Sequence, residues 1–202
     1  MESPLFIEEY CVIRNYKLTT SEQTLQFNPS LEIDDWIKAI YKEIGMHYPK
    51  FFKMDNVCKL SVLATEKVLA SNLKEDIGLF FVNNAGSMDS DCVHQSTIED
   101  KDNYYPSPAT FVYTLSNICA GEIAIRHKLQ TENIFLINDI FDPQMYLEHV
   151  NTMLSAQKCS KVLLGWVEVM DEKVDILIAL VGPTRGKINF TKNSLESIYK
   201  YS

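Results

Sequence analysis

The side chains best suited to nucleophilic or metal chemistry are cysteine and histidine, and in this sequence both are scattered. The cysteines are Cys11, Cys58, Cys92, Cys119 and Cys159, and the histidines are His47, His94, His127 and His149. No two cysteines form a C-x-x-C pair, so a disulfide framework is not indicated, and reduced thiols are typical of a cytoplasmic protein. No histidine has a second ligand at metal-binding spacing on one face. We therefore expect no metal and no cofactor.

Two positions could still carry chemistry, and each has a simpler structural interpretation. His94 follows three potential metal ligands, but the polar start of a helix accounts for the group better. These ligands are Asp89, Asp91 and Cys92. Cys119 lies in an apolar helical pattern with no His or Lys beside it, which favours a small core residue over a nucleophile.

Neither the glycines nor the acidic clusters indicate a site. The glycines do not compose a G-x-G-x-x-G motif or a phosphate-binding loop, so no nucleotide is expected. Glu99, Asp100 and Asp102 are expected to form a solvated loop rather than an acid–base pair.

Residues 132–150, ENIFLINDIFDPQMYLEHV, predict a buried strand, a tight corner and an amphipathic helix. In many α/β enzymes such a corner holds a Ser or Cys nucleophile. Here the corner reads NDIFDP and contains neither a thiol nor a hydroxyl. From periodicity alone, an ordinary strand–turn–helix is a sufficient interpretation.

Charge and hydropathy exclude several classes of protein. A formal net charge of −8 argues against nucleic acid or an anionic membrane as the main partner. The N-terminus has acids inside its apolar stretch and does not resemble a signal peptide, and no uncharged run approaches the ~20 residues of a membrane span. We expect one cytoplasmic α/β domain over residues 1–202.

Hydrophobic periodicity predicts alternating strands and helices. The predicted strands are Leu5–Arg14, Ile77–Gly86, Asn133–Asn138, Lys161–Met170 and Val174–Val181, the last two joined in a hairpin through Asp171, Glu172 and Lys173. The predicted helices are Ile33–Ile44, Met54–Ser71, Ser87–Ile98, Pro108–Leu129 and Pro143–Ala156. A polar loop is expected up to Ser30. This order indicates a layered α/β sheet.

The predicted helix Pro108–Leu129 is unusual because it has few charges before Glu122. Small residues recur along it at Ala109, Ser116, Ala120, Gly121 and Ala124. A nearly apolar helix of this kind is expected in a large core or in a subunit interface.

Four segments in order resemble the N-terminal half of a β-ketoacyl-acyl-carrier-protein synthase, in the thiolase-like superfamily. FFKMDNVCKLSVLATEKVLA resembles a helix of that family that begins R-K-M-D, with Phe52 in place of the arginine. IGLFFVNNAGSMDSD resembles the next strand and its glycine loop. SPATFVYTLSNICAGEIAIRHKLQTENIFLIN resembles the buried helix and following strand, and KVLLGWVEV resembles the returning strand. The likeness spans residues 50–170 and implies a layered α-β-α fold with a mixed sheet and a buried central helix.

The resemblance places the family's catalytic cysteine at Ile140, or at Phe141 if the turn is one residue longer. Neither side chain can form a thioester. The two active-site histidines of the family lie in a C-terminal half that the resemblance does not cover. Condensation by this chain alone is therefore not expected, because covalent catalysis needs a nucleophile and a group that activates it.

The resemblance implies a non-catalytic accessory subunit, similar to the chain-length factors that pair with an active synthase. Short relatives of this half that lack the cysteine accompany polyketide-like and aryl-polyene or flexirubin-type pigment synthases, so the implied role is in fatty-acid- or polyketide-type acyl-chain synthesis. The implied partners are a ketosynthase subunit, an acyl carrier protein, or both, in a homodimer or heterodimer. The residues expected near the dimer axis are Phe111, Asn117, Ala120, Gly121, Ala124, Ile134 and Leu136.

Two alternatives remain open at this stage. The chain could be an acyl-transfer or hydrolytic enzyme with a displaced nucleophile, using Cys119, Cys92 or a carboxylate near Asp139 and Asp142. It could also be a small-molecule-binding module that retains only the fold. Whatever the function, the sheet face that the C-terminal half covers in the family must be protected here by other means. We expect a dimer through 108–137 or a more polar surface on that face.

Overall fold

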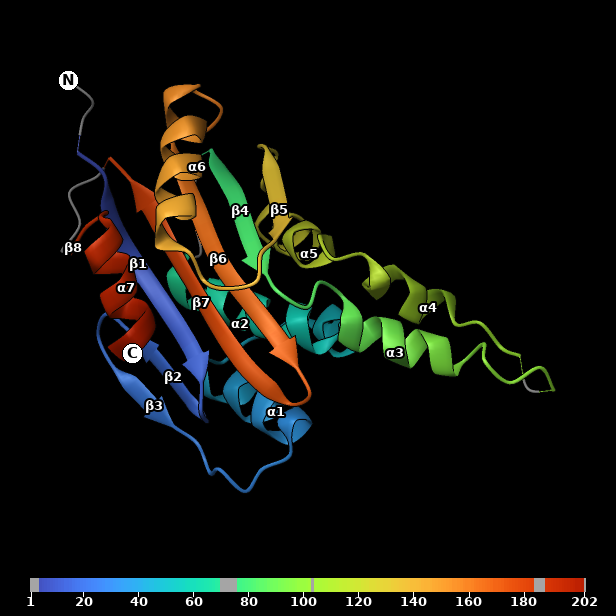
Figure 1. Cartoon of the computed structure of the whole chain (residues 1–202). Coiled ribbons are helices and arrows are strands. Elements are labelled where there is room, and N and C mark those ends of the chain that lie inside the picture. Colours follow the sequence, from blue (N-terminus) through green and yellow to red (C-terminus); the bar gives the residue numbers. More distant parts are fainter. Residues whose placement is uncertain (1–3, 70–75, 103, 184–187, 202) are drawn as a thin grey trace.

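Apolar strands and amphipathic helices assemble here into a layered α/β fold (Figure 1). The computed structural model describes residues 4–69, 76–102, 104–183 and 188–201. Its strands are β1 Phe6–Arg14, β2 Lys17–Thr20, β3 Thr24–Gln26, β4 Ile77–Asn83, β5 Asn133–Ile137, β6 Lys161–Met170, β7 Lys173–Gly182 and β8 Ile188–Asn189. Its α-helices are α1 Ile33–Glu43, α2 Asn56–Val68, α3 Met88–Ser96, α4 Pro108–Phe111, α5 Ile118–His127, α6 Pro143–Ser155 and α7 Lys192–Tyr201, with 3-10 turns η1 Pro49–Lys53 and η2 Val112–Thr114.

All eight strands belong to one mixed sheet. Its order is β3-β2-β1-β7-β6-β4-β5, and the short β8 pairs with β1. Strand β4 is parallel to both β5 and β6, whereas β7 is antiparallel to β6 and β1. The carboxyl ends of β4, β5 and β6 consequently meet at one edge of the sheet, which is where α/β proteins usually place their sites. The predicted mixed sheet is confirmed.

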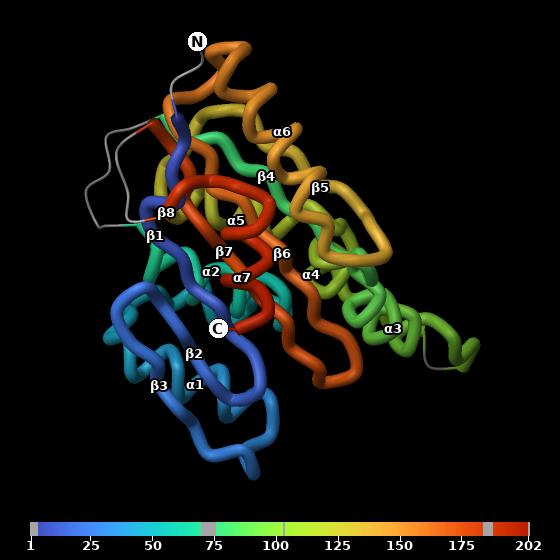
Figure 2. The backbone as a smooth tube through the Cα atoms, turned by 60° about the vertical axis from the view of Figure 1, so that its left-hand side comes forward, coloured from blue at the N-terminus to red at the C-terminus, as the bar shows by residue number. Residues whose placement is uncertain are grey.

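Helices cover both faces of this sheet. Helices α1, α2 and α5 lie on one face, and α6 and α7 lie on the other (Figure 2). Strand β4 serves both layers, because Leu79 and Phe81 join the core beneath α2 while Phe80 and Val82 join the core beneath α6. A strand buried on both faces needs a continuous apolar run, as predicted for it. None of the described helices has the length and apolarity that crossing a bilayer requires.

Helix α2 and the β6–β7 hairpin confirm two sequence predictions, although α2 ends at Val68 and its predicted end at Ser71 lies outside the described residues. The Asp55 side chain caps α2 by accepting a hydrogen bond from the Cys58 amide at 2.9 Å. The predicted inward stripe is buried throughout, at Met54, Val57, Cys58, Leu60, Ser61, Ala64, Val68 and Leu69. The hairpin turns through Asp171 and Glu172, both with positive φ (48° and 63°), the conformation that matches the twist of paired strands.

The single helix predicted over 108–129 is wrong in its first half. The segment forms α4 and η2, then turns extended at Leu115 (ψ 112°) before α5 begins at Ile118. Three β-branched residues alternate along α4 and η2, and Ser116 and Asn117 follow, a composition that disfavours a continuous helix. These β-branched residues are Thr110, Val112 and Thr114. The first half is also exposed rather than buried, whereas α5 packs against α2.

The polar loop predicted before Ser30 is also wrong, because β2 and β3 occupy it. Asn15 and Tyr16 adopt positive φ (49° and 57°) and reverse the chain in a two-residue turn that lacks glycine. Leu18 then inserts fully into the core. Helix α7 and strand β8 were not predicted, since their sequence is mostly polar.

Candidate functional site

The strand, corner and helix predicted at residues 132–150 are present as β5, a turn and α6. The prediction that the strand is buried is wrong, because β5 lies at the end of the strand order, with Asn133 and Ile137 exposed and the residues between them only partly buried. Asparagine hydrogen bonds hold the turn: the Asn138 amide donates to the Asn83 carbonyl (2.9 Å), and Asn138 Nδ2 donates to the Ile140 carbonyl (2.7 Å). Asp142 caps α6 by accepting from the Gln144 amide at 2.9 Å. We call residues 138–142 the elbow.

The elbow turns one apolar side chain outward and the next inward. Ile140 is 68% exposed. Phe141 is half-buried and stacks on Tyr199 of α7, with ring centroids 4.0 Å apart and planes 17° from parallel. It also contacts Tyr146 (5.2 Å) and Trp166 edge-on (6.1 Å). The exposed position thus carries no nucleophile, and aromatic rings fill the space behind it.

A carboxylate from β7 anchors this aromatic cluster. Asp175 accepts hydrogen bonds from Tyr199 Oη (2.6 Å) and Trp166 Nε1 (3.0 Å), and it pairs with Arg14. The Arg14 guanidinium lies over the Tyr199 ring, 4.4 Å from its centroid, and donates to the Tyr199 carbonyl. Burial, together with the hydrogen bond to Asp175, raises the pKa of the Tyr199 phenol. These contacts fix α7 beside the elbow.

A second carboxylate, Glu168 of β6, accepts hydrogen bonds from backbone amides beside the elbow. Its Oε2 accepts from the Asn84 amide (2.6 Å) and the Ala85 amide (3.1 Å), at the carboxyl end of β4. Asn84 Nδ2 donates in turn to the Asp139 carbonyl at 3.0 Å. Two adjacent N–H groups of this kind can bind an anion, but here an internal carboxylate already satisfies them.

The Asp175 and Glu168 contacts were missed from the sequence. The one signal was an acid inside each otherwise apolar strand, at Glu168 in VLLGWVEV and Asp175 in VDILIALV. In the sheet these acids lie directly opposite one another, and Arg14 lies opposite Asp175 from β1. Only that register identifies the partners.

The cysteines do not supply a displaced nucleophile near the elbow. Cys119, Cys58 and Cys11 are fully buried, and burial raises the pKa of each thiol, which removes the reactive thiolate. Cys119 is a core residue, as its apolar surroundings predicted. Cys159 is buried with a raised pKa, and Cys92 on α3 is exposed.

The metal-like group around His94 does not converge. Half-buried His94 packs on Phe111, with ring centroids 5.5 Å apart. Burial and the nearby carboxylates of Asp55 and Asp171 raise the pKa of Asp89. No cluster of three or more His, Cys, Asp or Glu side chains suited to a metal occurs in the part of the chain that the structure describes.

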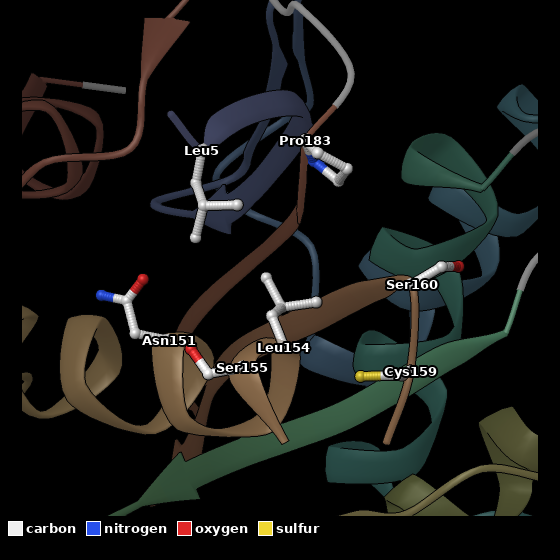
Figure 3. A pocket seen from close by; sticks show the side chains of 7 residues that line it. All are labelled: Leu5, Asn151, Leu154, Ser155, Cys159, Ser160 and Pro183. Carbon is white, nitrogen blue, oxygen red and sulfur yellow. The ribbon is translucent and has the colours of Figure 1, made fainter. Parts of the chain in front are cut away.

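Two cavities lie away from the elbow. One, of about 270 Å³, opens beside the starts of β1 and β6 and the end of β7, between the C-terminal turn of α6 and Cys159 (Figure 3). Its lining residues are Leu5, Asn151, Leu154, Ser155, Cys159, Ser160 and Pro183. The other, of about 410 Å³, lies between the starts of α1 and α2 and the helices α3 and α4. No elbow residue lines either cavity.

The face that carries α6 and α7 presents polar side chains to solvent. The exposed residues of α6 are Gln144, Glu148, Asn151, Thr152 and Ser155. Tyr146 and Val150 point inward and are fully buried. Helix α7 packs beside α6 and buries Leu195 and Ile198. This layer therefore has the amphipathic pattern of an outer layer.

Of the predicted dimer-interface residues, Ile134 and Leu136 lie on β5, which pairs with β4 alone within the described ranges. Phe111 and Asn117 are exposed, and Gly121, Ala124, Ile134 and Leu136 are partly exposed. Ala120 is fully buried in the chain's own core. Their role in an interface stays a prediction.

Comparison with known protein families and with characterised proteins finds no match to this sequence. Solved structures do match. The ishigamide ketosynthase/chain length factor superposes with a TM-score of 0.64 at 14% identity, over 89% of this chain and 62% of that one. A ketosynthase in complex with its chain length factor from Xenorhabdus doucetiae gives 0.60 at 14%, over 89% and 79%.

The chain has a ketosynthase-like fold. A type II polyketide synthase ketosynthase, solved with its acyl-carrier protein and a bound hexaketide, also matches, with a TM-score of 0.56 at 8% identity over 90% of this chain and 62% of that one. Our chain thus spans less than two thirds of the length of two of these three. At such identities the likeness concerns the fold, and it confirms the thiolase-like arrangement that the motifs implied.

Proposed function

We propose that this protein is a non-catalytic, chain-length-factor-like subunit that pairs with a ketosynthase in fatty-acid- or polyketide-type acyl-chain synthesis. The observation that carries the proposal is the elbow, where Ile140 takes the exposed position that a nucleophile would need. A ketosynthase must form a thioester with its acyl chain, and a hydrocarbon side chain cannot do so. Phe141, the alternative position, is equally inert and is packed against Tyr199.

The free edge of β5 supports a role in pairing. Residues Asn133–Ile137 carry no charge, and an uncharged strand edge readily pairs with another chain. Ile137 at its end is 56% exposed, and Ile140 in the elbow that follows exposes further apolar surface. Strand-to-strand pairing across this edge would extend the sheet into a partner of the same fold.

The solved structures support the choice of partner. One is described as a ketosynthase in complex with its chain length factor, and another as a ketosynthase in complex with an acyl-carrier protein. We propose the ketosynthase as the direct partner and the carrier protein as the bearer of the growing chain. Aryl-polyene or flexirubin-type pigments are the products that the sequence resemblance favours.

Co-expression with each ketosynthase encoded in the genome of the source organism tests the proposal. We expect a stable complex by size-exclusion chromatography with light scattering, and condensation of malonyl and acyl carrier proteins by the complex but not by this chain alone. Ile137→Lys should abolish the complex, because it places a charge on the pairing edge. Tyr201→Lys, a matched change at an exposed position of α7, should leave it intact. Condensation by this chain alone would refute the non-catalytic role.

A further inference from the structure

Exposed apolar side chains gather on one side of the molecule. Helix α3, the loop that follows it, α4 and η2 form an arm, defined here as residues 88–102 and 104–115, that projects beyond the β5 edge in both views (Figures 1 and 2). Among the described residues, every exposed large apolar side chain except Phe52 and Tyr201 comes from this arm, α5, β5 or the elbow. These are Met88, Val93, Tyr104, Tyr105, Phe111, Val112, Leu115, Ile125, Ile137 and Ile140. A patch of this extent marks an interaction surface.

The arm is built as a unit. Helix α3 packs along α4 and η2, and His94 of α3 contacts the Phe111 ring. Ser87 Oγ donates to the Thr114 carbonyl at 2.7 Å, which joins the base of α3 to the end of η2. Because the arm extends past the β5 edge, a chain that pairs with β5 must also lie against the arm.

The same side of the molecule is strongly acidic. The arm contains five carboxylates and one lysine, namely Asp89, Asp91, Glu99, Asp100, Asp102 and Lys101. Residues 129–157, which include β5, the elbow and α6, contain four carboxylates and neither Lys nor Arg. Helix α5, which also contributes to the patch, has Arg126 in its last turn, paired with Glu66, and is followed by the exposed Lys128. Glu132 and Asp139, at the two ends of β5, are both exposed. The apolar patch thus lies within a negatively charged surround.

We infer that the arm and the β5 edge together bind one ketosynthase-fold chain whose matching face is basic, and not a second copy of this chain. The inference rests on the proposed function and identifies its partner more closely. A two-fold dimer brings the same patch of both subunits together. In a homodimer the carboxylates of one arm would therefore face those of the other, and each arm has one lysine to compensate five carboxylates. Like charges across an interface suppress pairing, whereas a basic face both attracts the arm and compensates its charge.

Charge reversal at the tip of the arm tests this. The variant Glu99→Lys/Asp102→Lys is compared with Glu22→Lys/Glu43→Lys, which makes the same charge change at exposed sites on the β2–β3 turn and α1. Binding of the ketosynthase that forms the complex in the co-expression experiment is measured at low and at high salt. We expect the arm variant to bind about tenfold more weakly at low salt, with a flatter dependence on salt, and the control to match the wild type. The purified wild-type chain alone should be monomeric at micromolar concentration and low salt.

Three outcomes would decide against parts of this scheme. A wild-type homodimer at low salt overturns the inference. So does a ketosynthase complex that Ile137→Lys abolishes but whose affinity is the same for the wild type and for Glu99→Lys/Asp102→Lys. In both cases the proposed function survives. Absence of any complex between the wild-type chain and the ketosynthase at every salt concentration overturns the proposed function, and this inference with it.

Discussion

Phe141 and Tyr199 stack with their ring centroids 4.0 Å apart, which joins the elbow to a helix that begins 50 residues later in the chain. This contact closes the space behind the elbow with the chain's own aromatic surface. The stack therefore holds the elbow against α7.

Truncation to alanine should have different effects on stability at Phe141 and at Ile140. Phe141→Ala removes half-buried aromatic contacts, and we expect it to lower the free energy of unfolding by about 2–3 kcal/mol. Ile140→Ala removes an exposed side chain and should cost about 0.5 kcal/mol or less. Urea unfolding followed by tryptophan fluorescence measures both. Equal costs would show that Phe141 is not packed as described.

The stability of the protein should fall in acid through Glu66. Burial opposes the ionised form of Glu66, but hydrogen bonds from His127 and Arg126 lower its pKa from the ordinary 4.5 to about 2. The folded state thus holds the proton less tightly than the unfolded state. Its stabilising contribution is complete above about pH 4.5 and is lost as pH falls toward 2. Because the pair is partly solvated, we expect about 1–2 kcal/mol.

The control for this pH dependence is Glu66→Gln, which cannot ionise. Its free energy of unfolding should depend less on pH between 5 and 3 than that of the wild type, by about 1–2 kcal/mol. Identical pH profiles for the two proteins would exclude Glu66 as the source.

Neutralising Asp89 should stabilise the protein. Burial raises the pKa of Asp89, and the carboxylates of Asp55 and Asp171 raise it further. An acid whose pKa is raised on folding weakens the folded state once it ionises. Asp89→Asn should therefore raise the melting temperature at neutral pH, by an amount that shrinks as pH falls. The partly exposed site limits the gain to about 0.5–1 kcal/mol. Asp102→Asn, at the exposed tip of the arm, should change the melting temperature little, and an equal rise there would count against this explanation.

Alkylation should report the burial of the thiols. In the native protein, iodoacetamide should label Cys92 alone, because the other four cysteines are buried. Ile140→Cys should add a second rapidly labelled site, since that position is exposed, without conferring condensation activity. Intact-mass spectrometry counts the labels. Rapid native labelling of Cys119 would reopen a displaced thiol mechanism.

The elements that could be predicted from sequence are those whose signals are local. Strand β4 reads as seven buried residues in a row, and α2 reads as an inward stripe behind the Asp55 cap. The elbow between β5 and α6 was predicted with its apolar residues in place. The helix predicted over 108–129 is interrupted at Leu115. The sequence did not reveal this interruption, because an apolar segment without charges has the pattern of a buried helix whether or not its backbone is continuous.

The sequence by itself determined the layered α/β order and the lack of a nucleophile at the corner, because periodicity and residue type are properties of short segments. Only the tertiary structure decided which way Ile140 and Phe141 point and what stands behind them. Arg14 and Asp175 are 161 positions apart, and the register between β1 and β7 brings them face to face. Such long-range pairing depends on the whole sheet, so no local pattern encodes it.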